Sequence, residues 1–327
     1  MTVADKPVEP DFPSQADPYR RELLAHCYRM LGSVHDAEDL VQETYLRAWR
    51  AFDRFEGRST LRTWLYRIAT SACLTALESR GRRPLPAGLG GPSEGAGQSL
   101  EERPEVPWLE PMPSGTDSTT DPAADPAAVV TSRESMRLAF VAALQHLPPR
   151  QRAVLILRDV LAWRAAEVAE LLDTTTAAVN SALQRARAQL DEVAPTPESV
   201  TEPDEERTKE LLARYVAAFE RKDIDAIVSL LAQDAVWEMP PFATWFQGPE
   251  RVARHLAGQC PGGPGDFRVE PTSANGTPAL GMYLRGEDGV FRPFCLQVLT
   301  VTGSAFSHVV SFFDLRLFDT FGLPSTR

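Results

Sequence analysis

Residues 84–128 interrupt the sequence and restrict most strongly what it can fold into. This segment contains nine prolines, six glycines and eight acidic residues. Prolines and glycines disfavour regular elements and like charges disfavour compaction, so we expect no packed core there. The chain has 327 residues, 43% of them hydrophobic, so the flanking parts are long enough for two or three domains.

The part before this segment carries three helical stripes between residues 19 and 83. Apolar residues recur there at three- and four-residue spacing, which predicts amphipathic helices that each bury one face. Residues 1–18 lack this pattern and are predicted to be a flexible N-terminus. The stripes are Leu23, Leu24, Cys27, Tyr28 and Leu31; Ala37, Leu40, Val41, Ala48, Trp49 and Phe52; and Leu61, Trp64, Leu65, Ile68 and Ala72.

The part after the segment changes its periodicity once. Helical spacing returns over residues 132–193, which leaves residues 84–131 as an acidic linker. A second acidic linker is predicted at residues 194–205. Residues 206–327 begin with two helical stretches and then alternate with a period of two. The predicted fold class is therefore multidomain, with two all-α domains followed by a C-terminal α+β domain.

The net charge of −11 is unevenly distributed along the chain. Residues 19–83 carry 12 arginines against 8 acidic residues, whereas residues 194–327 carry 12 basic against 18 acidic residues. The overall acidity therefore does not exclude a surface that binds nucleic acid.

No stretch of the sequence has the length and apolarity of a signal core or a membrane span. We therefore expect a soluble, cytoplasmic protein without a membrane partner. The four cysteines lack the spacing of metal ligands, so no metal is expected. Each is predicted to be a small buried residue in a reducing compartment, namely Cys27, Cys73, Cys260 and Cys295.

Residues 163–190 have the pattern of a helix-turn-helix. One helix ends near Leu172, "DTT" provides a turn with capping side chains, and a second helix runs from Thr175 to Arg187. The second helix of such a motif enters the major groove of DNA. The alternative is an ordinary helical hairpin. The candidate DNA contacts are Thr175, Thr176, Asn180, Ser181, Gln184 and Arg187.

Two other predicted helices carry opposite charge. The helix over residues 59–80 places Arg62 and Arg67 beside aromatic and hydroxyl side chains, which suits single-stranded DNA because bases stack and phosphates pair. The helix over residues 35–49 is acidic on one face and would repel DNA. A protein with two partners of opposite charge needs both kinds of face. For each of these two helices, the alternative is that the charged face is exposed to solvent and binds no partner.

These parts together resemble a known family. "DAEDLVQETYLRAWRAFDRFEGRSTLRTWLYRIATSACLTAL" resembles region two of the extracytoplasmic-function (ECF, group-four) sigma factors of the sigma-70 family. "LPPRQRAVLILRDVLAWRAAEVAELLDTTTAAVNSALQRARAQL" resembles their region four. The resemblance implies a subunit that binds the β′ clamp and β subunit of core RNA polymerase and recruits the enzyme to promoter DNA. It implies no cofactor and no chemistry by the chain itself.

The resemblance also implies roles for individual residues. In the family, the acidic helix docks on the β′ clamp, and the matching residues are Asp36, Glu38, Asp39, Leu40, Gln42 and Glu43. The segment that captures a flipped base of the minus-ten element matches Phe55, Arg62, Trp64, Arg67 and Ser71.

The chain departs from the family at three positions, and its acidic linker resembles a connector in the family. Ser71 stands where many members have Asn, which puts the hydrogen bonds to the captured base in doubt. Asn180 and Ala182 stand where basic residues are common, which should weaken phosphate anchoring upstream. The acidic linker resembles the connector that threads the polymerase channel.

The C-terminal part resembles a SnoaL-like domain of the nuclear transport factor 2-like cone fold. The matching stretches are "LLARYVAAFERKDIDAIVSLLAQDAVWEMPP" and "SFFDLRLFDTFGLP". Such cones hold small apolar molecules in some relatives, so a small ligand is a possible partner. The candidate lining residues are Trp237, Met239, Phe242, Trp245, Met282, Phe294 and Phe312, and the titratable candidates are Asp234, His255, His308 and Asp314.

The resulting hypothesis is a sigma factor whose C-terminal domain modulates its activity without catalysis. One alternative is a bifunctional protein whose C-terminal domain is an enzyme acting on a small apolar metabolite. Another is a helix-turn-helix regulator that does not need polymerase. The sequence shows no pair of carboxylates at catalytic spacing, so it does not favour the enzyme alternative.

Overall fold

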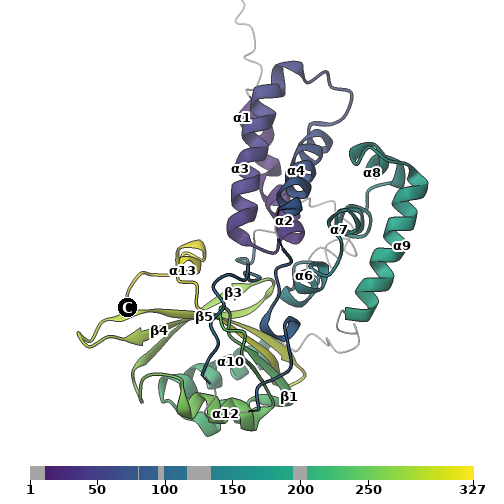
Figure 1. Cartoon of the computed structure of the whole chain (residues 1–327). Coiled ribbons are helices and arrows are strands. Elements are labelled where there is room, and N and C mark those ends of the chain that lie inside the picture. The colour runs from purple at the N-terminus through teal and green to yellow at the C-terminus, as the bar shows by residue number, and fades with distance from the viewer. Residues whose placement is uncertain (1–11, 80, 95–98, 116–133, 194–204) are drawn as a thin grey trace, which may run out of the picture. The chain divides into compact units, whose positions relative to one another are not determined.

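The computed structural model describes residues 12–79, 81–94, 99–115, 134–193 and 205–327 (Figure 1). The chain forms two compact units. One contains residues 1–80, 116–135 and 147–189, and the other contains residues 81–115, 136–146 and 190–327. None of the helices described is long and apolar enough to cross a membrane.

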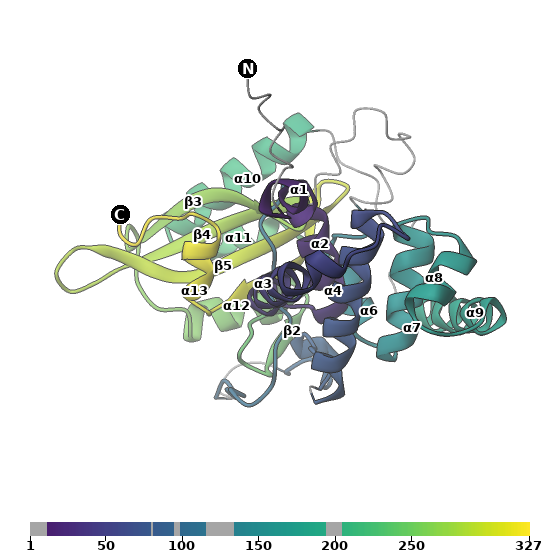
Figure 2. The ribbon, with the colours of Figure 1, turned by 90° about the horizontal axis from the view of Figure 1, so that it is seen from above.

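The first unit begins with a bundle of helices (Figure 2). Gly32 ends its first long helix in a left-handed conformation at φ 69°, and Ser33 caps the next by accepting a hydrogen bond from the Asp36 amide at 3.1 Å. Thr60 caps the last in the same way. The helices are α2 (Arg20–Leu31), α3 (Val34–Ala51) and α4 (Leu61–Glu78), with the short turn η2 (Phe52–Arg54) between the last two.

Residues 12–18 belong to this bundle, so the prediction of a flexible N-terminus is wrong for them. They form α1 (Phe12–Ala16) and the start of η1 (Asp17–Tyr19). Phe12 is buried, with its ring centroid 5.1 Å from that of Phe52. The remainder of the predicted flexible stretch, residues 1–11, lies outside the described residues.

The first unit also contains the helix-turn-helix. Asp173 turns the chain at φ 49°, and the Thr175 hydroxyl caps the second helix by accepting from the Ala178 amide at 3.1 Å. The apolar residues on both sides of this turn are buried. They are Val168, Leu172, Val179 and Leu183. The helices are α7 (Pro149–Leu155), the π-helical turn η4 (Ile156–Val160), α8 (Ala165–Leu171) and α9 (Thr176–Val193).

The second unit is built on a curved six-stranded sheet in the order β2-β1-β6-β5-β4-β3. β1 and β6 pair in parallel and the other neighbours are antiparallel. Register shifts in the pairing of β4 with β5 and of β5 with β6 indicate bulges, which bend strands. The strands are β1 (Leu231–Glu238), β2 (Trp245–Gln247), β3 (Phe267–Ala274), β4 (Thr277–Arg285), β5 (Phe291–Thr302) and β6 (Ala305–Phe312).

Three helices cover the concave face of this sheet and close a cone (Figure 1). They are α10 (Glu205–Glu220), α11 (Ile224–Ser229) and α12 (Pro249–Gly258). Tyr215 of α10 is fully buried against Phe306 of β6, with ring centroids 4.9 Å apart. The short helix α13 (Arg316–Thr320) contacts the sheet through Phe318, whose ring meets that of Tyr283. The predicted α+β domain is confirmed.

The described residues 81–94 and 99–115, which we call the strap, pack within the second unit. This contradicts the prediction that the Pro- and Gly-rich segment has no packed core. Residues of the strap are hydrogen-bonded to the sheet and its loops, for example from the Ser114 amide to the Ser273 carbonyl at 3.1 Å. The strap contains η3 (Pro86–Gly88), and its buried residues include Leu85, Trp108, Leu109 and Met112. Helix α6 (Leu138–Leu144) belongs to the same unit.

Candidate functional site

The acidic residues of α3 are accessible along one face. Asp39 and Gln42 are exposed, and Asp36, Glu38, Leu40 and Glu43 are partly exposed. Two of the acids already have partners, because Arg20 binds Glu38 at 2.9 Å and Arg47 binds Glu43 at 2.6 Å. Ion pairs at this level of exposure contribute little to stability, so they leave this face available to a stronger partner.

Arg62 of α4 is held inside the first unit. Its Nε and Nη2 atoms donate to the Glu22 carboxylate at 2.9 and 2.7 Å, and Glu22 is largely buried. Partial burial is the largest single influence on the pKa of Arg62 and lowers it, but the hydrogen bonds and charges of Glu22 and Tyr66 together raise the pKa by more, so it is raised overall. Of the predicted minus-ten residues, Arg62 is thus the one that has a strong partner within the protein.

The other residues predicted to meet the minus-ten element lie close together. The rings of Phe55 and Trp64 are 4.8 Å apart, and both side chains are partly exposed. Trp64, Arg67 and Ser71 line one groove of about 690 Å³. Arg67 and Ser71 are exposed. An aromatic ring, a guanidinium group and a hydroxyl group therefore share a surface on which a base and a phosphate could be held.

The predicted contacts of the recognition helix α9 all lie on its exposed side. Arg187 forms a two-point ion pair with Asp159, at 2.8 and 2.7 Å. The Ser181 hydroxyl accepts from Arg185 at 2.6 Å. The exposed candidates are Thr175, Thr176, Asn180, Ser181, Gln184 and Arg187.

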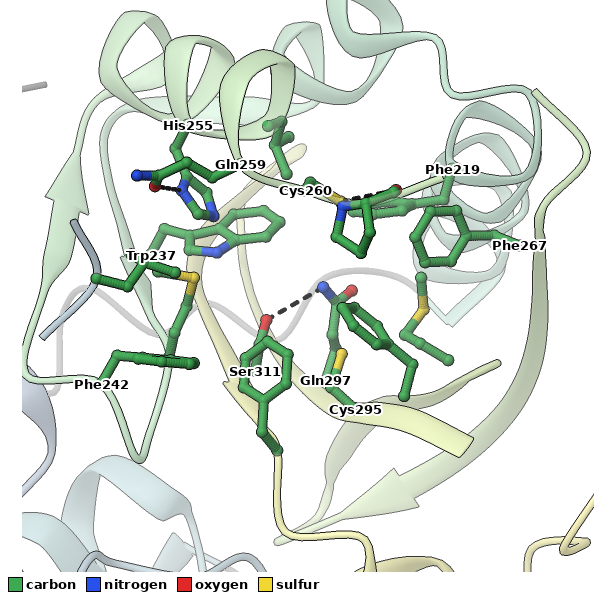
Figure 3. A pocket seen from close by; sticks show the side chains of 17 residues that line it. Phe219, Trp237, Phe242, His255, Gln259, Cys260, Phe267, Cys295, Gln297 and Ser311 are labelled. Carbon is green, nitrogen blue, oxygen red and sulfur yellow. Dashed lines mark hydrogen bonds between the residues drawn. The ribbon is translucent and has the colours of Figure 1, made fainter. Parts of the chain in front are cut away.

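The cone of the second unit encloses a cavity of about 290 Å³ (Figure 3). Five of the seven predicted lining residues face it: Trp237, Met239, Phe242, Met282 and Phe294. The prediction is wrong for the other two. The Trp245 indole instead donates to the Gly90 carbonyl of the strap at 2.9 Å, and β6 turns Ser311 and the following Phe313, rather than Phe312, towards the cavity.

The polar residues of this cavity were not predicted from the sequence. Gln297 of β5 is 2% exposed and donates from Nε2 to the Ser311 hydroxyl at 3.2 Å, while its Oε1 accepts from the buried Tyr215 hydroxyl at 3.1 Å. Trp237 is equally buried, and its indole N–H has no hydrogen-bond partner. The one sequence feature that points to a polar residue inside the cone is the glutamine within the apolar run "FCLQVLTV".

Only one of the four titratable candidates lines the cavity. His255 does so, and burial lowers its pKa. Asp234 is exposed, Asp314 forms an ion pair with Arg316 at 2.6 Å, and His308 binds the fully buried Glu238 at 2.8 Å. The structure does not bring these candidates together at one site. The cysteine prediction holds for three residues, whereas Cys260 is partly exposed.

Three family models match the chain in sequence. Sigma-70 region 2 matches residues 16–83, Sigma-70 region 4 matches residues 137–190, and a SnoaL-like domain matches residues 212–316. The first match covers α3 and α4, the second covers the helix-turn-helix, and the third covers most of the cone.

Relatives match along almost the whole chain. The ECF RNA polymerase sigma factor SigG of Mycobacterium tuberculosis is 58% identical over 97% of this chain and 85% of that protein. SigJ of the same organism, also an ECF sigma factor, is 31% identical over 88% of this chain and 86% of its own length. The crystal structure of SigJ superposes with a TM-score of 0.60 at 27% identity, covering 95% of this chain and 99% of that one. The chain belongs to the ECF RNA polymerase sigma factors and carries a SnoaL-like domain at its C-terminal end.

Proposed function

We propose that the acidic face of α3 docks on the β′ clamp of core RNA polymerase while α4 and α9 contact the minus-ten and minus-thirty-five elements of a promoter. The residues proposed for docking are Asp36, Glu38, Asp39, Leu40, Gln42 and Glu43. Those proposed for DNA are Phe55, Arg62, Trp64, Arg67 and Ser71 in the first surface, and Thr175, Thr176, Asn180, Ser181, Gln184 and Arg187 in the second. Because both partners lie with the nucleoid, we place the protein in the cytoplasm.

The observation that carries this proposal is the separation of charge between helices of the first unit. Asp39 and Gln42 are exposed on a face that also bears three further carboxylates. Arg67 and Ser71 are exposed on α4 beside partly exposed aromatic rings. Complementary potentials direct which surface meets which partner, so the first face suits a basic protein and the second suits nucleic acid.

Charge reversal tests the docking surface. Asp39→Lys combined with Glu43→Lys should lower the affinity for core polymerase on the order of a hundredfold, because two complementary contacts become repulsive. Asp191→Lys with Glu192→Lys reverses two exposed acids at the end of α9 and serves as the matched control. Co-purification with core enzyme at wild-type yield by the α3 variant, with the control also unaffected, would rule out docking through this face.

We further propose that the C-terminal domain modulates transcription and is not an enzyme. Acid–base catalysis needs titratable groups within reach of one substrate. His255 is the titratable imidazole among the described residues that line the cavity, and no carboxylate accompanies it there. Glu238, the buried carboxylate of β1, does not line the cavity. It is bound instead by His308 and by the Ala87 amide of the strap, the latter at 2.6 Å.

Point substitutions distinguish modulation from catalysis. His255→Phe should leave any effect of the C-terminal domain on transcription in place, since the ring stacked on Phe246 is preserved in shape. An enzymatic cone would instead convert a small apolar compound and lose that turnover in the same variant. Detection of such a turnover by the wild-type chain would overturn this part of the proposal.

A further inference from the structure

The indole N–H of Trp237 is an unused hydrogen-bond donor deep in an apolar cavity. Trp237 is 2% exposed and its Nε1 atom has no hydrogen-bond partner. Figure 3 shows this nitrogen turned towards the same space as the side-chain amide of Gln297. Buried polar groups in proteins are almost always paired, so an unpaired donor that faces a cavity calls for an explanation, and a bound molecule that accepts its hydrogen bond is one.

Two more donors point into this cavity. Gln297 is fixed by Tyr215, whose hydroxyl donates to Oε1, so the amide nitrogen faces Ser311 and the cavity. Gln297 uses one of its two N–H groups on the Ser311 oxygen. Since that oxygen is an acceptor in this contact, the Ser311 hydroxyl keeps its own hydrogen for another acceptor.

The rest of the wall is apolar and uncharged. No residue among those described around the cavity carries a permanent charge, and His255 has a pKa lowered by burial. An anion or cation would lose its hydration there without a counter-charge, which is strongly unfavourable. The volume of about 290 Å³ lies at the low end of ligand pockets and suits a molecule of one or two rings.

We infer that the cone binds a small, neutral, largely apolar molecule that carries a carbonyl oxygen, and that Trp237, Gln297 and Ser311 donate hydrogen bonds to this oxygen. Ketones, lactones and quinones of one or two rings share this chemistry. Phenyl and methylene groups of the ligand would pack on the aromatic and methionine side chains of the wall.

The strap forms part of this wall. Leu100 lines the cavity beside Phe242, and the residues that follow pair with the same loop. The Glu101 carbonyl accepts from the Ala243 amide at 2.8 Å, and the Arg103 amide donates to the Pro241 carbonyl at 2.9 Å. A ligand in the cone would therefore rest against the segment that joins the two sigma regions.

Matched pairs of probes test the inference on the full chain. Acetophenone is compared with α-methylstyrene, and 1-acetylnaphthalene with 1-isopropenylnaphthalene, by calorimetry or equilibrium dialysis. Each pair has nearly the same shape, because a methylene group (=CH2) replaces the carbonyl oxygen. We expect at least one ketone to bind about tenfold more tightly than its hydrocarbon partner, the fold-change of about one neutral hydrogen bond. Equal affinity within both pairs, or no binding by any probe, overturns the inference.

Substitutions locate the carbonyl. Trp237→Phe should remove most of the preference for the ketone, whereas Trp49→Phe, at a tryptophan that is 62% exposed on α3, should keep it. If Trp237→Phe does not fold, Ser311→Ala takes its place, and it should also reduce the preference. A ketone preference that persists in the folded variant contradicts the assignment.

Amide hydrogen exchange shows whether the probe sits in the cone. Binding of the preferred ketone should slow exchange of the Ala243 amide, which pairs with the strap beside Leu100. Binding without any change at this amide would place the probe elsewhere and would overturn the site.

Discussion

Two arginines predicted to contact DNA are bound by carboxylates that lie far away in the sequence. Arg62 pairs with Glu22, 40 residues earlier, and Arg187 pairs with Asp159, 28 residues earlier. Helical spacing could predict that these side chains occupy polar faces, but it could not reveal these partners, because they depend on how the helices pack. Promoter binding through either arginine must compete with its carboxylate.

This competition predicts opposite effects at one ion pair. Arg187→Ala should weaken promoter binding by the holoenzyme and lower its salt slope by about one, as expected for a lost phosphate contact. Asp159→Asn should instead tighten binding a few-fold, since the partner that competes with phosphate for Arg187 loses its charge and the volume is unchanged. Promoter affinity measured at several salt concentrations checks both. If both variants weaken binding alike, the pair only stabilises the fold.

His26 makes the stability of the first unit depend on pH. It is fully buried, and burial together with Arg29 and Arg62 lowers its pKa from 6.5 to about 3. The folded state therefore holds a neutral ring, while the unfolded state takes up a proton below pH 6.5. Stability contributed by this residue is complete above pH 6.5 and declines as the pH falls towards 3, by at most about 1.4 kcal/mol per pH unit.

The measurement compares wild type with His26→Leu in urea unfolding at pH 7.5 and 5.5. The variant also loses the 2.9 Å contact with the Thr70 hydroxyl, so it should be less stable at both pH values. The difference between the two proteins should nevertheless shrink at pH 5.5. A difference in stability that is the same at both pH values would mean that His26 does not cause the pH dependence.

At the scale of elements, α9 is the part whose function the sequence indicated most directly. The capping residues of the turn predicted where the helix begins, and its polar positions are exposed. Asn180 lies near its start, where recognition helices meet base edges. We predict that Asn180→Ala changes which upstream bases are preferred, while Glu192→Gln near the other end of α9 does not.

A randomised promoter library transcribed by the holoenzyme provides the measurement for α9. Recovery of the same upstream sequence with Asn180→Ala and wild type would show that this helix does not read bases through Asn180. A parallel loss across all sequences would point to a phosphate contact instead.

The strands were harder to orient than the helices. Alternation predicted strands within residues 206–327, yet Phe312 was assigned to the cavity when Ser311 and Phe313 face it. Residues 309–312 are all buried, so the side chains on both faces of β6 are covered and periodicity cannot say which face lines the cone. β2 has only three residues, which is too few for a period to show.

At the scale of the whole molecule, the strap is the feature whose packing could not be predicted from composition. Its prolines and acids predicted a linker without a core, but Trp108, Leu109 and Met112 are buried. Scattered apolar residues in a proline-rich segment have no period, and the residue that binds the Met112 amide, Asn275, lies 163 residues away in the sequence.

Asn275 forms hydrogen bonds to the strap, so substitution of Asn275 should weaken the packing of the strap on the sheet. Its Oδ1 accepts from the Met112 amide at 3.0 Å and its Nδ2 donates to the Met136 carbonyl at 2.7 Å, in a left-handed turn at φ 54°. Asn275→Gly keeps this conformation but removes both bonds, and should cost about 1–3 kcal/mol. Asn275→Ala should cost more, because alanine disfavours positive φ.

Hydrogen exchange at the Met112 amide gives the readout for both variants. Exchange should accelerate with glycine and further with alanine. Unchanged protection of Met112 in both would show that other contacts hold the strap.

Run-off transcription with purified core RNA polymerase tests the central claim most directly. We predict that the full chain directs core enzyme to start at one position on promoters selected from genomic DNA, and that Asp39→Lys with Glu43→Lys abolishes this transcript while Asp191→Lys with Glu192→Lys preserves it. Failure of the wild-type chain to produce any promoter-specific transcript, with core enzyme that responds to another sigma factor, would contradict the account.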